Sequence, residues 1–154
     1  MTRIGLVSDT HGLLRPEAIA FLRGSDHIVH AGDIGRPEIL DALAALAPLA
    51  AIRGNIDVAA WAADVPRTLR VELAGVHFLV LHDRSRLDFD PAAAGIDVVV
   101  SGHSHKPLIE RRAGVLYVNP GSAGPRRFKL PVTAAELLVS GGTVTPRIVD
   151  LLAA

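Results

Sequence analysis

The chain has 154 residues, with 16 basic and 16 acidic side chains, and 49% of its residues are hydrophobic. This hydrophobic content excludes an intrinsically disordered chain, and the balanced charge argues against a broad basic surface for nucleic acid. Cysteine is absent, which excludes disulfides and thiolate metal sites. The length predicts a single domain over residues 1–154, since domains commonly have ~100–150 residues.

The first half of the chain alternates short apolar runs with helical segments. Three apolar runs are predicted strands: Ile4–Ser8, His27–Ala31 and Leu49–Arg53. Between them, Pro16–Arg23 and Pro37–Ala47 are predicted helices, each beginning with Pro, and Gly24 follows the first. This β-α-β-α-β order predicts a parallel sheet with right-handed crossovers.

The second half is dominated by strand pairs joined at glycine-containing turns. The predicted pairs are Thr68–Leu73 with Val76–Leu81, Leu108–Arg111 with Val115–Val118, and Ala135–Val139 with Val144–Val149. A helical turn at Pro91–Ala94 is expected before the apolar strand Ile96–Val100. We therefore predict an α/β fold with two mixed sheets packed face to face and helices outside.

No apolar run approaches the ~20 residues that span a bilayer, and the segment before the first polar motif is too short for a secretory signal. These features predict a cytoplasmic protein with no membrane partner.

Polar clusters stand where the apolar runs end. They are Ser8-Asp9-Thr10-His11, Gly32-Asp33, Gly54-Asn55-Ile56-Asp57, His82-Asp83 and Gly102-His103-Ser104-His105. In open α/β folds, ligands bind at the carboxyl ends of the strands. Carboxylate, amide and imidazole groups are the oxygen and nitrogen ligands of divalent metals. The recurrence of these groups predicts a metal-dependent enzyme.

Each cluster also has a plain structural interpretation. An Asp or Asn after Gly, like Asp33 or Asn55, is commonly a turn residue or a helix cap. Asp9 and His11 fit capping as well as ligation. His103 and His105 favour ligation, because two imidazoles have little other reason to cluster. His30 fits a buried structural histidine, with a hydrogen bond behind the site as the alternative.

Taken in order, these clusters resemble the calcineurin-like metallophosphoesterases, and most of all the small bacterial and archaeal phosphodiesterases of the YfcE type. The resemblance runs from residue 3 to about 125 and includes the loop Asn119-Pro120-Gly121-Ser122. It implies a four-layer αββα sandwich with a two-metal centre at the strand ends. One metal would take Asp9, His11 and His105, the other would take Asn55, His82 and His103, and Asp33 would bridge them.

The resemblance also implies the chemistry of a phosphodiesterase, a hydrolase acting on phosphoric ester bonds. Two divalent ions (manganese, nickel, iron or zinc) ~3.5–4 Å apart would hold a hydroxide for in-line attack on a small phosphodiester. Asp33, Asn55 and His103 would carry the catalytic roles. Arg126 is the candidate for binding substrate phosphate, because guanidinium matches phosphate geometry, although arginines also commonly lie solvated on the surface.

Two positions depart from the family pattern. Ile56 stands where many larger members have a His that protonates the leaving group, which favours diesters over monoesters. Asp83 follows His82 where Gly is frequent, and its carboxylate either orients His82 or adds negative charge near the substrate.

Two rival functions follow from the same residues. The first is a non-enzymatic interaction scaffold with an idle metal site, as in the retromer subunit that resembles this family; the complete ligand set favours the enzyme. The second is a nuclease on polynucleotide, which the balanced charge and the aromatic content of 4% disfavour. Small family members often self-associate, so a homo-oligomer is also expected.

Overall fold

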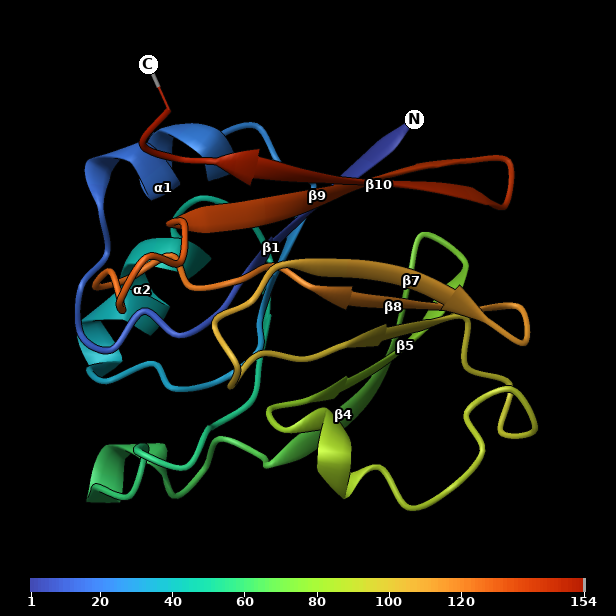
Figure 1. Ribbon diagram of the computed structural model, residues 1–154, viewed down its shortest axis with the longest axis horizontal. Helices are drawn as coiled ribbons and strands as arrows, with labels where there is room; N and C mark the ends of the chain where they lie inside the picture. Colours follow the sequence, from blue (N-terminus) through green and yellow to red (C-terminus); the bar gives the residue numbers. More distant parts are fainter. Residues whose placement is uncertain (154) are drawn as a thin grey trace.

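The computed structural model describes residues 1–153, which form two five-stranded sheets (Figure 1). In spatial order, sheet A contains β10 (Thr143–Asp150), β9 (Thr133–Ser140), β1 (Thr2–Val7), β2 (His27–His30) and β3 (Leu49–Ala51). Sheet B contains β4 (Thr68–Leu73), β5 (Val76–Leu81), β6 (Val98–Val100), β8 (Val115–Asn119) and β7 (Leu108–Arg112).

Sheet A follows the predicted β-α-β-α-β order. Strands β1, β2 and β3 are parallel, and α1 (Pro16–Leu22) and α2 (Pro37–Ala44) connect them. Both helices begin with Pro as predicted, and the chain leaves α1 through Gly24 at a φ of +83°. The antiparallel pair β9–β10 extends the sheet on the other side of β1.

Sheet B contains three parallel strands, β5, β6 and β8, and its edge strands β4 and β7 are antiparallel to their neighbours. The three predicted hairpins are confirmed. Pro91–Ala94 forms the single expected helical turn, in which the Ala94 amide donates to the Asp90 carbonyl at 3.2 Å and the Ile96 amide donates to the Pro91 carbonyl at 2.9 Å. Gly95, with a φ of +78°, ends this turn before a helix can continue.

The main core lies between the sheets. Leu6 and Val29 of sheet A pack against Phe78, Val100 and Leu116 of sheet B, all almost fully buried. A second cluster lies on the outer face of sheet A, where Ala18, Leu22, Ile39 and Leu43 of the two helices are buried. Figure 1 shows both helices beside this sheet.

The outer face of sheet B is covered differently. Leu87 and Ala94, from the segment between β5 and β6, pack on Leu79, Leu81 and Tyr117. Within residues 1–153 the only helical piece of that segment is a 3₁₀ turn, η2 (Arg84–Arg86). The α/β sandwich of two mixed sheets is thus confirmed, and its fourth layer is a loop with one 3₁₀ turn. No helix of residues 1–153 is long and apolar enough to cross a membrane.

Candidate metal centre

The predicted ligands all follow parallel strands. Asp9 and His11 follow β1, Asp33 follows β2, Asn55 follows β3, His82 follows β5, and His103 and His105 follow β6. The carboxyl ends of these strands meet at one edge of the sandwich, where the two sheets face each other. The topology therefore brings together residues that lie far apart in the sequence.

Asp9 is fully buried at the middle of this group. Its Oδ2 accepts hydrogen bonds from Ser8 Oγ at 2.7 Å and from the His103 amide at 3.1 Å. Its Oδ1 has no hydrogen-bond partner within the described residues. Three imidazole Nε2 atoms surround Oδ1, from His105 at 3.4 Å, His11 at 3.6 Å and His82 at 3.8 Å. A buried carboxylate oxygen among imidazole nitrogens is suited to sharing a cation with them.

Asp33 faces one imidazole of each predicted ligand set. Its Oδ2 lies 3.2 Å from His82 Nε2 and 3.5 Å from His11 Nε2. Its Oδ1 accepts a hydrogen bond from the Ile56 amide at 3.1 Å. This orientation is the one that a ligand shared by two ions needs.

Two groups of side chains present ligand atoms within 4.8 Å of one another, Asp9–His11–His105 and Asp9–Asp33–His82. The first reproduces a predicted set. The ring centroids of His11 and His105 lie 5.2 Å apart, and those of His82 and His103 also lie 5.2 Å apart. The prediction assigned the same pairs of histidines to the two ions.

The orientation of His82 is determined by a backbone group. Nδ1 lies 2.8 Å from the Ala31 carbonyl oxygen, and because a carbonyl only accepts, Nδ1 carries the proton. Nε2 then presents its lone pair to Asp33, buried and with no hydrogen bond inside residues 1–153. A lone pair facing a carboxylate is repulsive unless a proton or a metal ion lies between them, and this donor set fits a divalent metal.

The pKa shifts in the site also favour a bound cation. Burial alone would raise the pKa of Asp9, but His105, His11 and Ser8 outweigh it and hold that pKa well below its usual value. For Asp33, burial is likewise outweighed by His82 and the Ile56 amide, and its pKa is also lowered. Conversely, burial disfavours the imidazolium of His82, yet Asp33 and the Ala31 carbonyl raise its pKa. Two anionic carboxylates thus attract a positive charge to this point.

Backbone strain is concentrated at the predicted ligands. Five of them have left-handed backbone, Asp9 (φ 56°), His11 (48°), Asp33 (57°), His103 (72°) and His105 (63°). For a residue with a Cβ this conformation costs roughly 1–2 kcal/mol, and such strain is typical of functional sites.

The glycines of the motifs are needed because the loops approach closely. A methyl group on Gly54 would overlap the backbone nitrogen and carboxylate of Asp33, and one on Gly102 would overlap Ser8 Oγ and Asp9 Oδ2. Gly54 and Gly102 therefore allow the ligand loops to pack against one another.

Asp57, a residue of the third polar cluster, has a structural role because it binds backbone amides. Its carboxylate is 2% exposed and accepts hydrogen bonds from the amides of Ile34 (3.0 Å), Gly54 (2.9 Å) and Gly35 (2.9 Å). It thereby joins the loops that carry Asp33 and Asn55. Sequence reasoning assigned no role to Asp57, since spacing alone does not separate a ligand from a residue that binds backbone amides.

His30 is the buried structural histidine that the plain interpretation predicted. Its Nδ1 accepts from the Gly32 amide at 3.0 Å, so its Nε2 donates to Thr10 Oγ1 at 2.9 Å, and Thr10 in turn donates to the Ile34 carbonyl at 2.9 Å. Burial lowers the pKa of His30 to about 4, which keeps the ring neutral.

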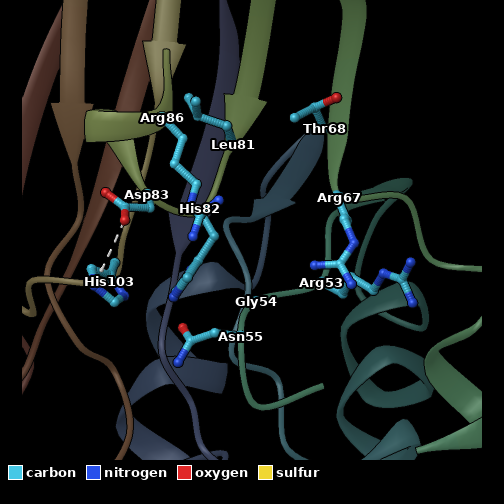
Figure 2. Close-up of a pocket in the computed structure, with 10 residues that line it drawn as sticks. All are labelled: Arg53, Gly54, Asn55, Arg67, Thr68, Leu81, His82, Asp83, Arg86 and His103. Atoms are coloured by element: carbon cyan, nitrogen blue, oxygen red, sulfur yellow. Dashed lines mark ion pairs between the residues drawn. The ribbon is translucent and has the colours of Figure 1, made fainter. Parts of the chain in front are cut away.

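A cavity of about 560 Å³ opens beside His82 (Figure 2). Its lining residues are Arg53, Gly54, Asn55, Arg67, Thr68, Leu81, His82, Asp83, Arg86 and His103. Asn55 and His103 are exposed and lie at its wall instead of inside the buried group. Asp83 does not orient His82: its Oδ1 accepts from Ser85, and its Oδ2 faces His103 Nε2 at 3.9 Å.

Arg126 lies on the other side of the centre. It lines a cavity of about 170 Å³ together with His11 and His105, and its Nε donates to the Leu130 carbonyl at 3.2 Å. Arg67 and Arg86, which line the larger cavity, were not identified from the sequence because no motif contains them.

Comparisons with known proteins show the family of the chain. A model of the calcineurin-like phosphoesterase superfamily domain matches residues 2–142. A probable metallophosphoesterase of Methanothermobacter thermautotrophicus is 36% identical over 141 residues, covering 83% of this chain and 81% of that protein.

Two solved structures share the fold. One, described as a novel archaeal phosphodiesterase, has a TM-score of 0.78 at 24% identity and covers 96% of this chain and 100% of its own. Vps29 of Chaetomium thermophilum also has a TM-score of 0.78, at 17% identity, covering 96% of this chain and 94% of its own. On the match over residues 2–142, the chain belongs to the calcineurin-like phosphoesterase superfamily.

Proposed function

We propose that this protein is a metal-dependent phosphodiesterase acting on a small phosphodiester. The observation that carries the proposal is Asp9 Oδ1, a buried carboxylate oxygen without a hydrogen bond in residues 1–153 that faces three imidazole nitrogens. The fold shared with an archaeal phosphodiesterase supports the same reaction class.

In this proposal Asp9, His11 and His105 hold one divalent ion, Asn55, His82 and His103 hold a second, and Asp33 serves both. Manganese, nickel, iron and zinc all suit these nitrogen and oxygen donors. When bound, the ions would offset the charge of the phosphate and lower the pKa of the attacking water.

The residues around the ligands keep them in position. The Ala31 carbonyl holds His82 in the tautomer with a free Nε2, and Ser8 together with the His103 amide fixes Asp9 so that Oδ1 faces the imidazoles. Such partners behind the ligands orient them and raise their basicity. Substrate would reach the centre through the cavity of about 560 Å³, where Asn55 and His103 are exposed.

A preference for diesters with good leaving groups follows from two side chains. Ile56 has no proton to donate, is 41% exposed and does not line the cavity. Ser85 lowers the pKa of Asp83, which is therefore ionised at neutral pH and is no general acid either.

The proposal is tested by measuring hydrolysis of bis(p-nitrophenyl) phosphate and p-nitrophenyl phosphate side by side, with added Mn²⁺ and with chelator. We expect the diester to be hydrolysed faster, chelator to abolish the activity, and Asp33→Ala to remove it at unchanged fold. The exposed Asp64→Ala serves as the matched control. Undiminished hydrolysis by Asp33→Ala in chelator would overturn the proposal. Metal-loaded protein that turned over neither ester but bound one specific protein would instead indicate the scaffold function.

A further inference from the structure

The cavity beside His82 is lined by arginine side chains that are not among the proposed metal ligands. Three arginines line it, Arg53, Arg67 and Arg86. Figure 2 shows Arg53 and Arg67 on one side of the cavity and Asp83 with His103 on the other. The amide of Arg53 donates to the Pro66 carbonyl at 2.8 Å, which holds the end of β3 beside the start of β4 and so brings the two arginines together.

Arg53 and Arg67 have no counter-ion in residues 1–153, although the chain is neutral overall. Four of the described arginines pair with a carboxylate, among them Arg3 and Arg147 with Glu136 at 2.6 and 2.7 Å and Arg84 with Glu110 at 3.2 Å. Arg53 and Arg67 are distinguished from the other unpaired arginines by their shared place at one side of this cavity. The Nε of Arg53 is buried and has no hydrogen-bond partner among the described residues. Both arginines line one cavity without a carboxylate paired to them, so their positive charge is one that a bound anion would neutralise.

Asp83 is the one acidic residue in the cavity lining, and it does not neutralise this pair. Ser85 donates to the carboxylate of Asp83 through its amide at 3.0 Å and its hydroxyl at 2.7 Å. Figure 2 shows Arg86 on the side of Asp83, away from Arg53 and Arg67. Arg53 and Arg67 are left as the free positive end of the cavity.

We infer that Arg53 and Arg67 bind a second phosphate of the substrate, one that is not hydrolysed. Guanidinium groups recognise phosphate by paired, charge-assisted hydrogen bonds. The substrate class is therefore a phosphodiester that also carries a phosphomonoester, as phosphorylated nucleotide esters do. This inference rests on the proposed function in one respect, that the scissile phosphate lies at the metal ligands next to the same cavity.

A matched pair of chromogenic substrates tests the inference. Thymidine 5′-(p-nitrophenyl phosphate) and its 3′-phosphorylated derivative release the same leaving group and differ only in the second phosphate. We expect the 3′-phosphate to raise kcat/KM about tenfold or more, and Arg67→Gln to remove most of that ratio. Arg70→Gln, within β4 and three residues after Arg67, changes charge equally, but the Arg70 guanidinium donates to the Ala94 carbonyl and does not line this cavity, so the ratio should persist.

Binding without turnover separates the inference from the proposed function. Calorimetric titration of the chelator-treated protein should show thymidine 3′,5′-bisphosphate binding more tightly than thymidine 5′-monophosphate, with Arg53→Gln and Arg67→Gln each removing the difference. Because Arg67 is exposed, its variant should fold even if Arg53→Gln does not. If the protein hydrolyses no ester but this difference holds, the inference stands while the proposed function fails. If hydrolysis occurs and neither the 3′-phosphate nor Arg67→Gln changes kcat/KM or binding, the inference is overturned.

Discussion

The carboxylate of Asp57 accepts a hydrogen bond from the backbone amide of Ile34 at 3.0 Å, immediately after the proposed bridging ligand Asp33. The same carboxylate accepts from the Gly54 amide at 2.9 Å, immediately before Asn55. One buried side chain thus fixes the distance between two ligand loops that follow different strands. Asp57 acts on the centre only through these loops.

Asp57→Asn is expected to destabilise the protein. The amide side chain presents only one acceptor oxygen and places N–H donors toward backbone N–H groups. Leaving one or two buried donors unsatisfied should lower the free energy of unfolding by about 2–3 kcal/mol. Urea denaturation measures this, with the exposed Asp64→Asn as the control. Equal unfolding midpoints for the two variants would contradict the assigned role.

Divalent metal is expected to stabilise the folded chain. Mn²⁺ at about 100 times its dissociation constant should add about 2.7 kcal/mol to the free energy of unfolding, and chelator should reverse this. His82→Ala should remove most of the metal-induced rise in Tm. His77→Ala, within β5 and with a side chain 55% exposed, should retain it. A rise in Tm that persists in His82→Ala would place the metal elsewhere.

Gly54→Ala is expected to damage the centre more than the fold. The added methyl group overlaps the backbone and carboxylate of Asp33, so one of the two loops must shift, which disturbs the position of the Asp33 carboxylate beside His11 and His82. Metal-binding isotherms should show a loss of affinity. Gly95→Ala is the control, because its φ of +78° makes alanine strained while the space around it is open. Similar metal affinity in both variants would show that Asp33 is not a ligand.

Acid should weaken the fold through His30. The pKa of His30 is about 4 in the folded protein and 6.5 ordinarily, so between these values the unfolded chain binds more protons. The free energy of unfolding should therefore fall as the pH drops from 6.5 toward 4, by about 3 kcal/mol from this residue. His30→Gln should have a flatter pH profile of stability, and His27→Gln should keep the profile of the natural chain. Parallel profiles for all three proteins would refute this assignment.

The sheets could be predicted from the sequence, and candidate ligands could be proposed, because both leave local signals. Apolar runs that stop at a polar residue identify β1, β2 and β5, and the topology of parallel strands then gathers Asp9, Asp33 and His82. The single helical turn predicted at Pro91–Ala94 is present, and Gly95, in left-handed backbone, ends it before β6.

Other features depend on packing between distant segments. Asp33 and Asp57 are the same residue type in similar loops, and only the three amides around Asp57 distinguish them. The juxtaposition of Arg53 with Arg67 arises where the end of β3 meets the start of β4, across two different sheets. No spacing rule connects those positions.

The left-handed backbone at the candidate ligands lowers the stability of the folded chain at positions whose side chains are proposed to bind metal. His103 is exposed, has a φ of 72°, and a glycine there would adopt the same backbone without strain. His103→Gly should therefore make the metal-free protein more stable, by roughly 1 kcal/mol, while weakening metal binding. The same trade-off applies in part at the other strained positions, Asp9, His11, Asp33 and His105. At these five positions a side chain with metal-binding chemistry stands where glycine would fold with less strain, and such strain is typical of functional sites.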